Sequence, residues 1–365
     1  MDFRVTPWEV SGKIDYGKLI EQFGVSEIDD GLLKRLPDNF MLRRKIFYAH
    51  RDLGRIVEAH EKGDEFYLYT GRGPSGRIHV GHLLPWLFNR FLQREWGTEL
   101  YFQLTDDEKF LFNEELSLED TKSLAYENAL DIIALGFDPK KTTIFLDTDN
   151  MGVLYPIALR VSKRVTFSTA RAVFGFDAST NIGSIFYTSM QSAPAFLVSE
   201  LRGRSVPCLI PCAIDQDPHF RVTRDVAEPL GYPKPASIYC KLLPSLIGGD
   251  KMSSSTPESS IFTTDDEETV RKKITNAFTG GAPTVKEQRI HGGNPDICPV
   301  HAYHYFLFEP DDEKVKRIYD DCRSGSLLCG ECKKMLVEKV NSFLTEHREG
   351  REWAKDHIDD FVKRI

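Results

Sequence analysis

The sequence predicts an α/β protein with a doubly wound parallel sheet, a helical insertion and an all-α C-terminal domain. Apolar strand patterns alternate with amphipathic helices as far as residue 263, which is the order that builds a parallel sheet. Helices and loops replace this alternation over residues 151–204. After Thr264 the strand patterns end, and the segments 265–278, 311–323, 329–347 and 352–362 are amphipathic.

The N-terminal part of the chain is mixed. Residues 15–23 and 43–60 have helical patterns, and residues 5–10 predict a short strand pair or an extended arm. Trp8 lies in this arm, where it fits either core packing or a covering role.

A glycine-rich turn follows the strand predicted at residues 66–70. Gly71, Gly73 and Gly76 lie within six residues of one another, together with Pro74, so the chain must turn sharply there. Helical spacing of apolar residues begins after this turn, and residues 100–104 form the next strand. The result is a strand–loop–helix–strand unit, whose crossover we expect to be right-handed.

The start of that helix suits a phosphate group. Its unpaired N–H groups and positive dipole end attract anions, and a glycine turn lets a ligand approach the backbone. His79 and His82 lie at this helix start, and Gly81 between them leaves room for a flat base or a sugar. Two such histidines are also ordinary surface or cap residues, so this motif alone leaves both interpretations open.

A second polar stretch lies far downstream. Lys251-Met252-Ser253-Ser254-Ser255 follows a strand-like run at residues 237–243 and a pair of glycines. A lysine and three hydroxyls on a glycine-flanked loop predict an anion clamp, although a serine run by itself is also typical of linkers.

Polar residues also follow the short apolar strand at residues 207–212. Gln216, Asp217 and Phe220 come just after it, at the strand end where open α/β sheets bind their ligands. Asp217 before Pro218 predicts a helix start, and Arg221 and Arg224 on that helix are near enough in sequence to help with phosphates. In the preceding half of the sheet, Ser117 and Asp120 predict a capping box for another helix.

Composition limits the possible functions. The net charge of −8 argues against broad, nonspecific nucleic-acid binding, but leaves room for local basic faces. Arg160, Lys163, Arg164 and Arg171 form one basic stripe, for which a solvated face is slightly favoured over an RNA contact. No apolar run is long enough to cross a bilayer and residues 1–4 do not open a signal peptide, so we expect no membrane association.

The seven cysteines are an odd number without framework spacing, which predicts reduced thiols in the cytoplasm. The residues with metal-ligand character near the C-terminus are Cys298, His301, His304, Cys322, Cys329 and Cys332. A zinc site would need four of them, but no second Cys-x-x-Cys accompanies the first. We therefore expect no metal-ligating residues.

The two polar loops, in this order, resemble the signatures of class I aminoacyl-tRNA synthetases. The sequences at residues 66–75, 105–109, 210–218 and 231–236 further resemble the eukaryotic and archaeal tryptophanyl-tRNA synthetases, and the similarity extends over nearly the whole chain. The resemblance implies an N-terminal extension at 1–45, a Rossmann-like catalytic domain at 46–263 with its insertion at about 151–204, and a helical anticodon-binding domain at 264–365. It also implies a homodimer formed through the insertion.

The resemblance implies an ATP-dependent ligase with Mg²⁺ as cofactor. Tryptophan attacks the α-phosphorus of ATP, and the resulting adenylate passes its aminoacyl group to the 3′ end of tRNA(Trp). The ATP-binding residues implied are Thr70, Gly71, Arg72, Gly73, His79, Gly81, His82, Lys251, Met252, Ser253 and Ser255. Lys251, His79, His82, Lys109 and Arg72 are the implied catalytic residues, with Lys109 facing the substrate carboxylate or the α-phosphate.

The implied tryptophan pocket consists of Tyr69, Gln103, Glu108, Gln191, Gln216 and Phe220. Indole offers one N–H donor, which the Tyr69 hydroxyl and the Gln103 carbonyl can accept. Glu108 and the glutamine oxygens can receive the substrate ammonium. Ser254 stands where the class has a second lysine, so one phosphate-directed charge is missing from the loop.

Three alternatives remain. A tyrosyl-tRNA synthetase would have an aspartate shortly after the glutamine that matches Gln191, and here Ser192, Ala193 and Pro194 follow. A small nucleotidyltransferase would lack the insertion and the helical third. A non-enzymatic RNA-binding scaffold protein would not need both signature loops.

Overall fold

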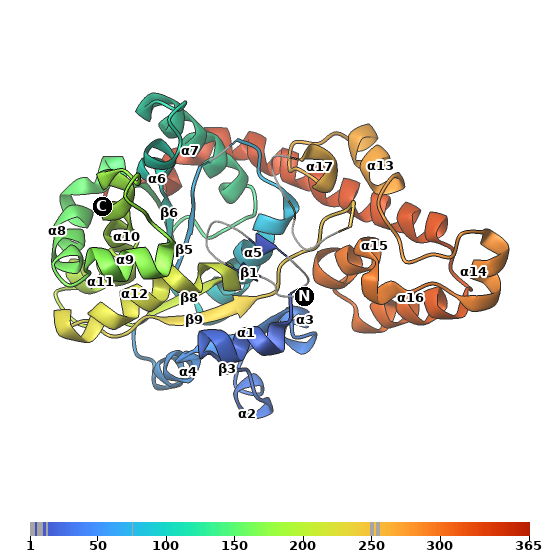
Figure 1. Cartoon of the computed structure of the whole chain (residues 1–365), viewed down its shortest axis with the longest axis horizontal. Coiled ribbons are helices and arrows are strands. Elements are labelled where there is room, and N and C mark those ends of the chain that lie inside the picture. Colours follow the sequence, from blue (N-terminus) through green and yellow to red (C-terminus); the bar gives the residue numbers. More distant parts are fainter. Residues whose placement is uncertain (1–3, 6–9, 12–13, 75, 249–251, 253–255) are drawn as a thin grey trace.

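The computed structural model describes residues 4–5, 10–11, 14–74, 76–248, 252 and 256–365. Among them, a seven-stranded sheet forms the centre of the molecule, with strand order β3-β4-β9-β8-β5-β6-β7 (Figure 1). Its strands are β3 (Ser26–Glu27), β4 (Phe47–Arg51), β5 (Tyr67–Arg72), β6 (Glu99–Leu104), β7 (Thr142–Leu146), β8 (Cys208–Ala213) and β9 (Ala236–Cys240). The five strands β9, β8, β5, β6 and β7 are parallel. At one edge β4 pairs antiparallel with β9, and β3 pairs antiparallel with β4.

The strand order reverses between β5 and β8. From β5 the chain builds outward through β6 to β7, and it then returns to the other side of β5 to add β8 and β9. In a doubly wound sheet, ligands bind at this switch point, outside the carboxyl ends of the strands. The predicted fold class is confirmed, and the predicted strands at 66–70, 100–104 and 207–212 correspond to β5, β6 and β8.

Helices cover both faces of the sheet. The helices before the insertion are α1 (Tyr16–Phe23), α2 (Asp30–Leu33), α3 (Phe40–Arg43), α4 (Leu53–Lys62), α5 (Val80–Trp96), α6 (Asp106–Phe112) and α7 (Leu118–Ile133). The later ones in this part of the chain are α8 (Met151–Ser162), α9 (Phe167–Phe174), α10 (Ile182–Met190), α11 (Pro194–Arg202) and α12 (Asp217–Ala227). One large apolar core joins α4, α5 and α7 to the sheet, and a second joins α1, α8, α10, α11 and α12 to its other face.

Two local predictions can be compared with the structure here. The capping box predicted at the start of α7 is present, with the Ser117 hydroxyl accepting from the N–H of Asp120. The helix predicted over residues 43–60 is wrong in its first half, because residues 44–52 are not helical and Phe47–Arg51 is strand β4. β4 pairs antiparallel with β9, nearly 190 residues further along the chain, so no local pattern reveals its pairing.

The C-terminal third forms a helical lobe beside the sheet, at the right of Figure 1. Its helices are α13 (Glu267–Thr275), α14 (Val285–His291), α15 (Pro299–Tyr303), α16 (Asp312–Ser324) and α17 (Cys329–Phe361), with a short π-helix at His304–Phe308. The two helices predicted at 329–347 and 352–362 are one continuous helix, α17. Its second half leaves the lobe and packs against α7, where His347 Nε2 lies 2.8 Å from Asp131 Oδ1.

The described part of the N-terminal arm is a two-stranded antiparallel pair, β1 (Arg4–Val5) with β2 (Val10–Ser11), as predicted. Trp8 lies outside the described residues. No helix in the described part of the chain is both long and apolar enough to cross a membrane.

Candidate active site

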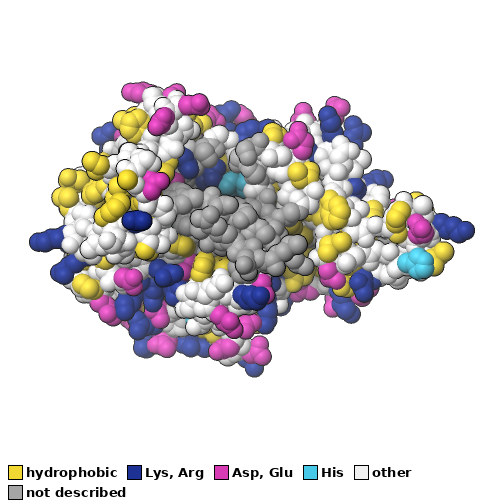
Figure 2. Space-filling model, in the orientation of Figure 1, with side chains coloured by type: hydrophobic (Ala, Val, Ile, Leu, Met, Phe, Trp, Pro, Cys, Tyr) yellow, Lys and Arg dark blue, Asp and Glu magenta, His cyan; other side chains and the backbone are white. Residues whose placement is uncertain are grey.

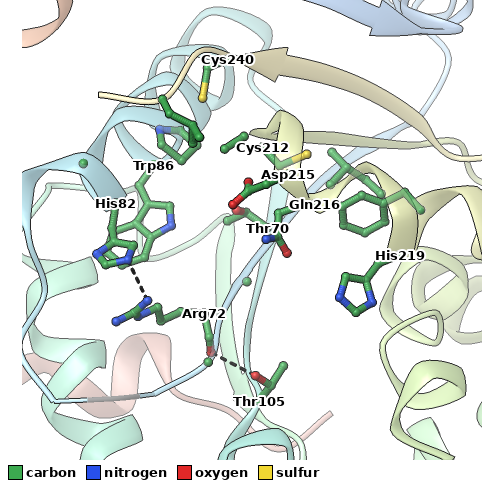
Figure 3. A pocket seen from close by; sticks show the side chains of 18 of the residues that line it. Thr70, Arg72, His82, Trp86, Thr105, Cys212, Asp215, Gln216, His219 and Cys240 are labelled. Carbon is green, nitrogen blue, oxygen red and sulfur yellow. Dashed lines mark hydrogen bonds between the residues drawn. The ribbon is translucent and has the colours of Figure 1, made fainter. Parts of the chain in front are cut away.

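A cavity of about 430 Å³ opens at the carboxyl ends of β5 and β8, at the switch point of the sheet (Figure 3). The predicted site residues that line it are Tyr69, Thr70, Gly71, Arg72, Gly73, His79, Gly81, His82, Glu108, Lys109, Gln191, Gln216, Phe220 and Met252. Lys251, Ser253 and Ser255 lie outside the described residues, as does Ser254. Gln103 is described, but it lies behind the cavity wall.

On one side of the cavity, the start of helix α5 carries the two histidines. His79 is the N-cap residue of α5, and its ring stacks on that of His82 with centroids 3.7 Å apart. His82 Nε2 lies 2.9 Å from Arg72 Nη1 (Figure 3). Because a guanidinium only donates, the imidazole nitrogen accepts here. Burial lowers the pKa of Arg72 to about 10, so the side chain stays cationic at neutral pH.

Two glycines permit a close approach here. A Cβ on Gly81 would lie 2.9 Å from Met252 Sδ, so glycine lets the described residue of the second loop pack against the histidine turn. A Cβ on Gly73 would lie 2.4 Å from Lys109 Cε and 2.6 Å from Glu108 Oε2. The glycines therefore bring segments that are far apart in sequence around one space.

Glu108 and Lys109 form the floor between the two sides. The Thr105 hydroxyl donates to Glu108 Oε2 at 2.7 Å, and Lys109 Nζ lies 3.4 Å from Glu108 Oε1. A fixed carboxylate and an adjacent ammonium are thus available for a zwitterionic ligand, whose ammonium would pair with the first and whose carboxylate would pair with the second.

A buried hydrogen-bond relay forms the opposite side. The Tyr69 hydroxyl donates to Gln103 Oε1 at 2.5 Å, and Gln191 Nε2 donates to the Tyr69 hydroxyl at 3.4 Å. Gln103 Nε2 donates to both carboxylate oxygens of Asp147, at 2.9 and 2.8 Å. Tyr187 completes the chain by donating to Gln191 Oε1. Phe220 meets the Tyr69 ring edge-on at 6.2 Å.

Gln103 therefore has a different position from the one expected. We predicted that its carbonyl would face a ligand, but that oxygen accepts the Tyr69 proton and the side chain is fully buried. Asp147 holds the amide nitrogen, so the amide cannot flip without losing both contacts. Gln103 thus positions Tyr69, whose oxygen keeps lone-pair capacity for a donor in the cavity.

Sequence reasoning missed Asp147 and its neighbour Asp107. Burial raises the pKa of Asp147 well above its usual range, and the nearby Asp107 carboxylate raises it further. Burial also raises the pKa of Asp107, to about 6, and a hydrogen bond joins its carboxyl group to that of Asp147. Asp147 directly follows β7, so the strand-end rule that identified Gln216 after β8 would have identified it too.

The role predicted for Arg224 changes, whereas the basic stripe is mainly solvent-exposed, as the sequence favoured. Arg224 does not line the cavity, because it binds Asp52 at 2.7 Å and the Pro235 carbonyl. Within the basic stripe, Arg160 pairs with Glu200 at 2.6 Å, whereas Lys163, Arg164 and Arg171 are exposed. His219 lines the cavity without having been predicted, and burial lowers its pKa to about 4, so it is neutral.

Comparison with known proteins adds independent findings. Residues 61–345 match the family described as tRNA synthetases class I (W and Y). The chain is 54% identical to a protein of Pyrobaculum calidifontis named tryptophan–tRNA ligase, over 99% of this chain and 97% of that protein. The structure of the present chain resembles the tryptophanyl-tRNA synthetase from Giardia lamblia, with a TM-score of 0.90 and 36% identity over 96% of each chain. The tryptophanyl-tRNA synthetase of Plasmodium falciparum also matches, with a TM-score of 0.90 and 38% identity over 96% of this chain and 98% of that one.

Proposed function

The chain belongs to the class I tRNA synthetases (W and Y), and on this premise we propose that it joins tryptophan to tRNA(Trp) in an ATP-dependent reaction. The assignment of tryptophan as the amino acid depends on the chain of hydrogen bonds behind Tyr69, which runs through Gln103 to Asp147. Asp147 orients Gln103, and Gln103 takes the Tyr69 proton, so the phenol presents an acceptor to the cavity. Indole has one N–H donor and no acceptor, so this side of the cavity complements it.

The other end of tryptophan fits the floor of the cavity. Glu108 accepts the substrate ammonium, and the adjacent Lys109 faces the substrate carboxylate or the α-phosphate. Gln191 and Gln216 supply further amide groups, and Phe220 forms an apolar wall beside Tyr69. Since the substrate carboxylate is itself the nucleophile, the protein needs to orient it and to stabilise charge rather than supply a nucleophile.

The histidine side of the cavity holds ATP in this proposal. Arg72, His79 and His82 lie at the positive end of α5, where developing negative charge on the phosphates is stabilised. Thr70, Gly71, Gly73 and Gly81 leave room for the nucleotide. The carboxylate oxygen of tryptophan bonds to the α-phosphorus as the bond to the bridging oxygen breaks, and pyrophosphate leaves with that electron pair.

The second loop completes the phosphate site in this proposal. Met252 packs on Gly81, beside the histidine turn. We assign Lys251, Ser253 and Ser255 to the β- and γ-phosphates, where Lys251 supplies the positive charge. Mg²⁺ would be held mainly by the ATP phosphates, because no three ligating side chains converge on one point in the part of the chain that the structure describes.

The second step uses tRNA. A hydroxyl of the 3′-terminal ribose attacks the carbonyl carbon of the adenylate, and AMP leaves. We assign the helical lobe after residue 264 to binding of the anticodon, because it stands beside the catalytic sheet and extends away from it (Figure 1).

The state of the cysteines supports a cytoplasmic location in this proposal. All seven cysteines are free thiols, which is typical of proteins in a reducing compartment.

A homodimer through the insertion is also part of the proposal. Tyr155, Leu159, Phe167 and Ile182 on α8, α9 and α10 are 45–85% exposed. Hydrophobic side chains gather over these helices at the left of the surface in Figure 2. An apolar patch of this kind is typical of an interface between subunits.

Amino-acid-dependent exchange of pyrophosphate into ATP tests the proposal. We expect tryptophan to support exchange and tyrosine to support far less, because no aspartate that could hold a phenol follows shortly after Gln191. Exchange with tyrosine but not tryptophan would show that the substrate is wrong. No exchange with any amino acid would favour a non-enzymatic RNA-binding scaffold.

A further inference from the structure

The turn that carries His79 is paired with the chain that follows the second loop. On one side of His79, the N–H of Val80 donates to the Ile261 carbonyl at 2.9 Å. On the other side, the N–H of Thr263 donates to the Ile78 carbonyl, also at 2.9 Å. The place of His79 in the proposed nucleotide site therefore depends on a segment that lies far downstream in the chain.

Phe262 lies at the centre of this pairing, close to two cations. It is buried and forms the antiparallel bridge with His79, and the two rings meet edge to face with centroids 6.4 Å apart. The guanidinium carbon of Arg77 lies 4.3 Å from the centroid of the Phe262 ring, and Lys273 Nζ lies 4.6 Å from it. Each cation is attracted by the ring, but the two like charges repel each other unless an anion stands near them.

Asp265 supplies that anion. Its side chain is 1% exposed, and its Oδ1 accepts from Arg77 Nη2 at 2.5 Å. Its Oδ2 accepts from Lys273 Nζ at 2.6 Å and from the N–H of Phe262 at 2.9 Å. The carboxylate thus holds both cations and the backbone of the residue that pairs with His79. Loss of its charge would leave Lys273, which is 10% exposed, buried without its counter-ion.

The same residue joins the nucleotide turn to the helical lobe. Lys273 belongs to α13, and its Nζ also donates to the Ser260 carbonyl at 2.8 Å. Arg348 of α17 donates to the backbone carbonyl of Asp265 at 3.2 Å. α13 and α17 pack together in the lobe (Figure 1). Asp265 therefore lies where the glycine turn, the chain after the second loop and the helical lobe meet.

We propose that Asp265 is a positioning residue for formation of the adenylate, a role that rests on the proposed function. Arg77, Phe262 and Asp265 are outside the cavity lining that the described residues form, so they act without touching ATP. Asp265 acts through Arg77 and Phe262, which keep His79 in place at the start of α5. A shift of this turn moves the histidines relative to the phosphates, and a displacement of about 1 Å can cost on the order of a hundredfold in rate.

The test is Asp265→Asn, which keeps the size of the side chain and removes its charge. We expect kcat/KM for ATP in tryptophan-dependent pyrophosphate exchange to fall on the order of tenfold, because two cations lose their anion. The KM for tryptophan should stay unchanged. The dissociation constant of ATP, measured by isothermal titration calorimetry, should rise, and this second measurement needs no catalysis.

Glu309→Gln is the matched control. Glu309 is another nearly buried carboxylate, 7% exposed, which accepts from Lys339 Nζ and, at 3.1 Å, from the N–H of Asp311. Both contacts lie within the helical lobe, and Glu309 does not line the cavity that the described residues form. The control should lower the urea midpoint of unfolding, as Asp265→Asn does, but leave kcat/KM for ATP unchanged. Equal values of kcat/KM for ATP in the two variants would contradict the proposal.

A double-mutant cycle with Arg77→Gln tests whether Asp265 acts through Arg77. The Arg77 side chain is 49% exposed, so its replacement endangers the fold less while it removes the same contact. We expect the double variant to be about as impaired as Asp265→Asn alone, because residues of one network do not act additively. Fully additive effects would overturn the proposal. If Asp265→Asn fails to fold, Arg77→Gln alone is decisive, and an unchanged kcat/KM for ATP would contradict the proposal.

Failure of the proposed function would be recognised separately. If the unmodified chain exchanges pyrophosphate with no amino acid, the proposed function is wrong, and binding of ATP then decides the role of Asp265. An unchanged dissociation constant of ATP in Asp265→Asn would overturn the inference, as would a complete lack of ATP binding by the unmodified chain.

Discussion

The two sides of the active-site cavity are built in different ways. On the side proposed for the amino acid, Tyr69 is the group proposed to accept the indole N–H. It is buried, and successive hydrogen bonds through Gln103 to Asp147 hold it in place. On the nucleotide side, Arg72 and the two histidines come from one turn, and Met252 of a distant loop packs beside them. In the proposed reaction, the amino acid is therefore selected by groups fixed before binding, whereas charge is stabilised by groups from separate segments of the chain.

The largest effect is expected on the nucleotide side. We predict that Lys251→Ala slows adenylate formation on the order of a hundredfold, or about 3 kcal/mol, because it removes one charge that acts on the transition state. The dissociation constant for tryptophan should change little. Single-turnover rates and tryptophan binding measure the two effects separately, with Lys251→Arg as the charge-keeping control. An unchanged rate would remove Lys251 from the phosphate site.

On the amino-acid side we predict a change in KM. Gln103→Ala takes away the acceptor of the Tyr69 proton, so the hydroxyl can rotate, at a cost of about 1–3 kcal/mol. The KM for tryptophan should rise on the order of tenfold with little change for ATP. Steady-state pyrophosphate exchange measures both.

Gln93→Ala is the matched control for that variant. Gln93 is another buried glutamine, whose Nε2 donates to the Thr142 hydroxyl at 2.8 Å, outside the cavity. It should lower stability without changing the KM for tryptophan. Equal KM values in the two variants would mean that the relay does not position Tyr69.

A smaller effect is expected one step further from the substrate. Asp147→Ala frees the Gln103 amide to flip, so we predict a rise in the KM for tryptophan that corresponds to about 1 kcal/mol, roughly fivefold. Asp147→Asn keeps an acceptor for Gln103 and should stay close to the unmodified enzyme. The same exchange assay compares the two, and an alanine variant with unchanged KM would limit the relay to Tyr69 and Gln103.

The last prediction concerns stability against pH. The folded protein raises the pKa of Asp147 and of Asp107, so above about pH 4, where an unfolded aspartate is ionised, it binds more protons than the unfolded chain. Stability therefore falls as the pH rises, by about 1.4 kcal/mol for each unit of pKa difference. Asp147→Asn should flatten this slope between pH 5 and pH 8 in urea unfolding. A slope equal to that of the unmodified protein would show that the pair does not retain a proton.

Local chemistry made much of the molecule predictable. The strand, glycine turn and helix around His79 and His82 follow from neighbouring residues, as does the capping box of Ser117. These features depend on contacts within a few residues, and such contacts can be read from spacing alone. The two signature loops supplied nine of the 27 described residues that line the cavity, and they did so through the family resemblance.

Tertiary structure decided the rest, because the deciding contacts join residues far apart in the chain. β4 is a strand only because β9 pairs with it, and Gln103 positions Tyr69 only because Asp147 holds its amide. Cys298, Cys322, Cys329 and Cys332 line one small cavity only because the segments around α15, α16 and α17 pack together. A side chain's type and spacing set which bonds it can make, but the fold alone decides which partner reaches it.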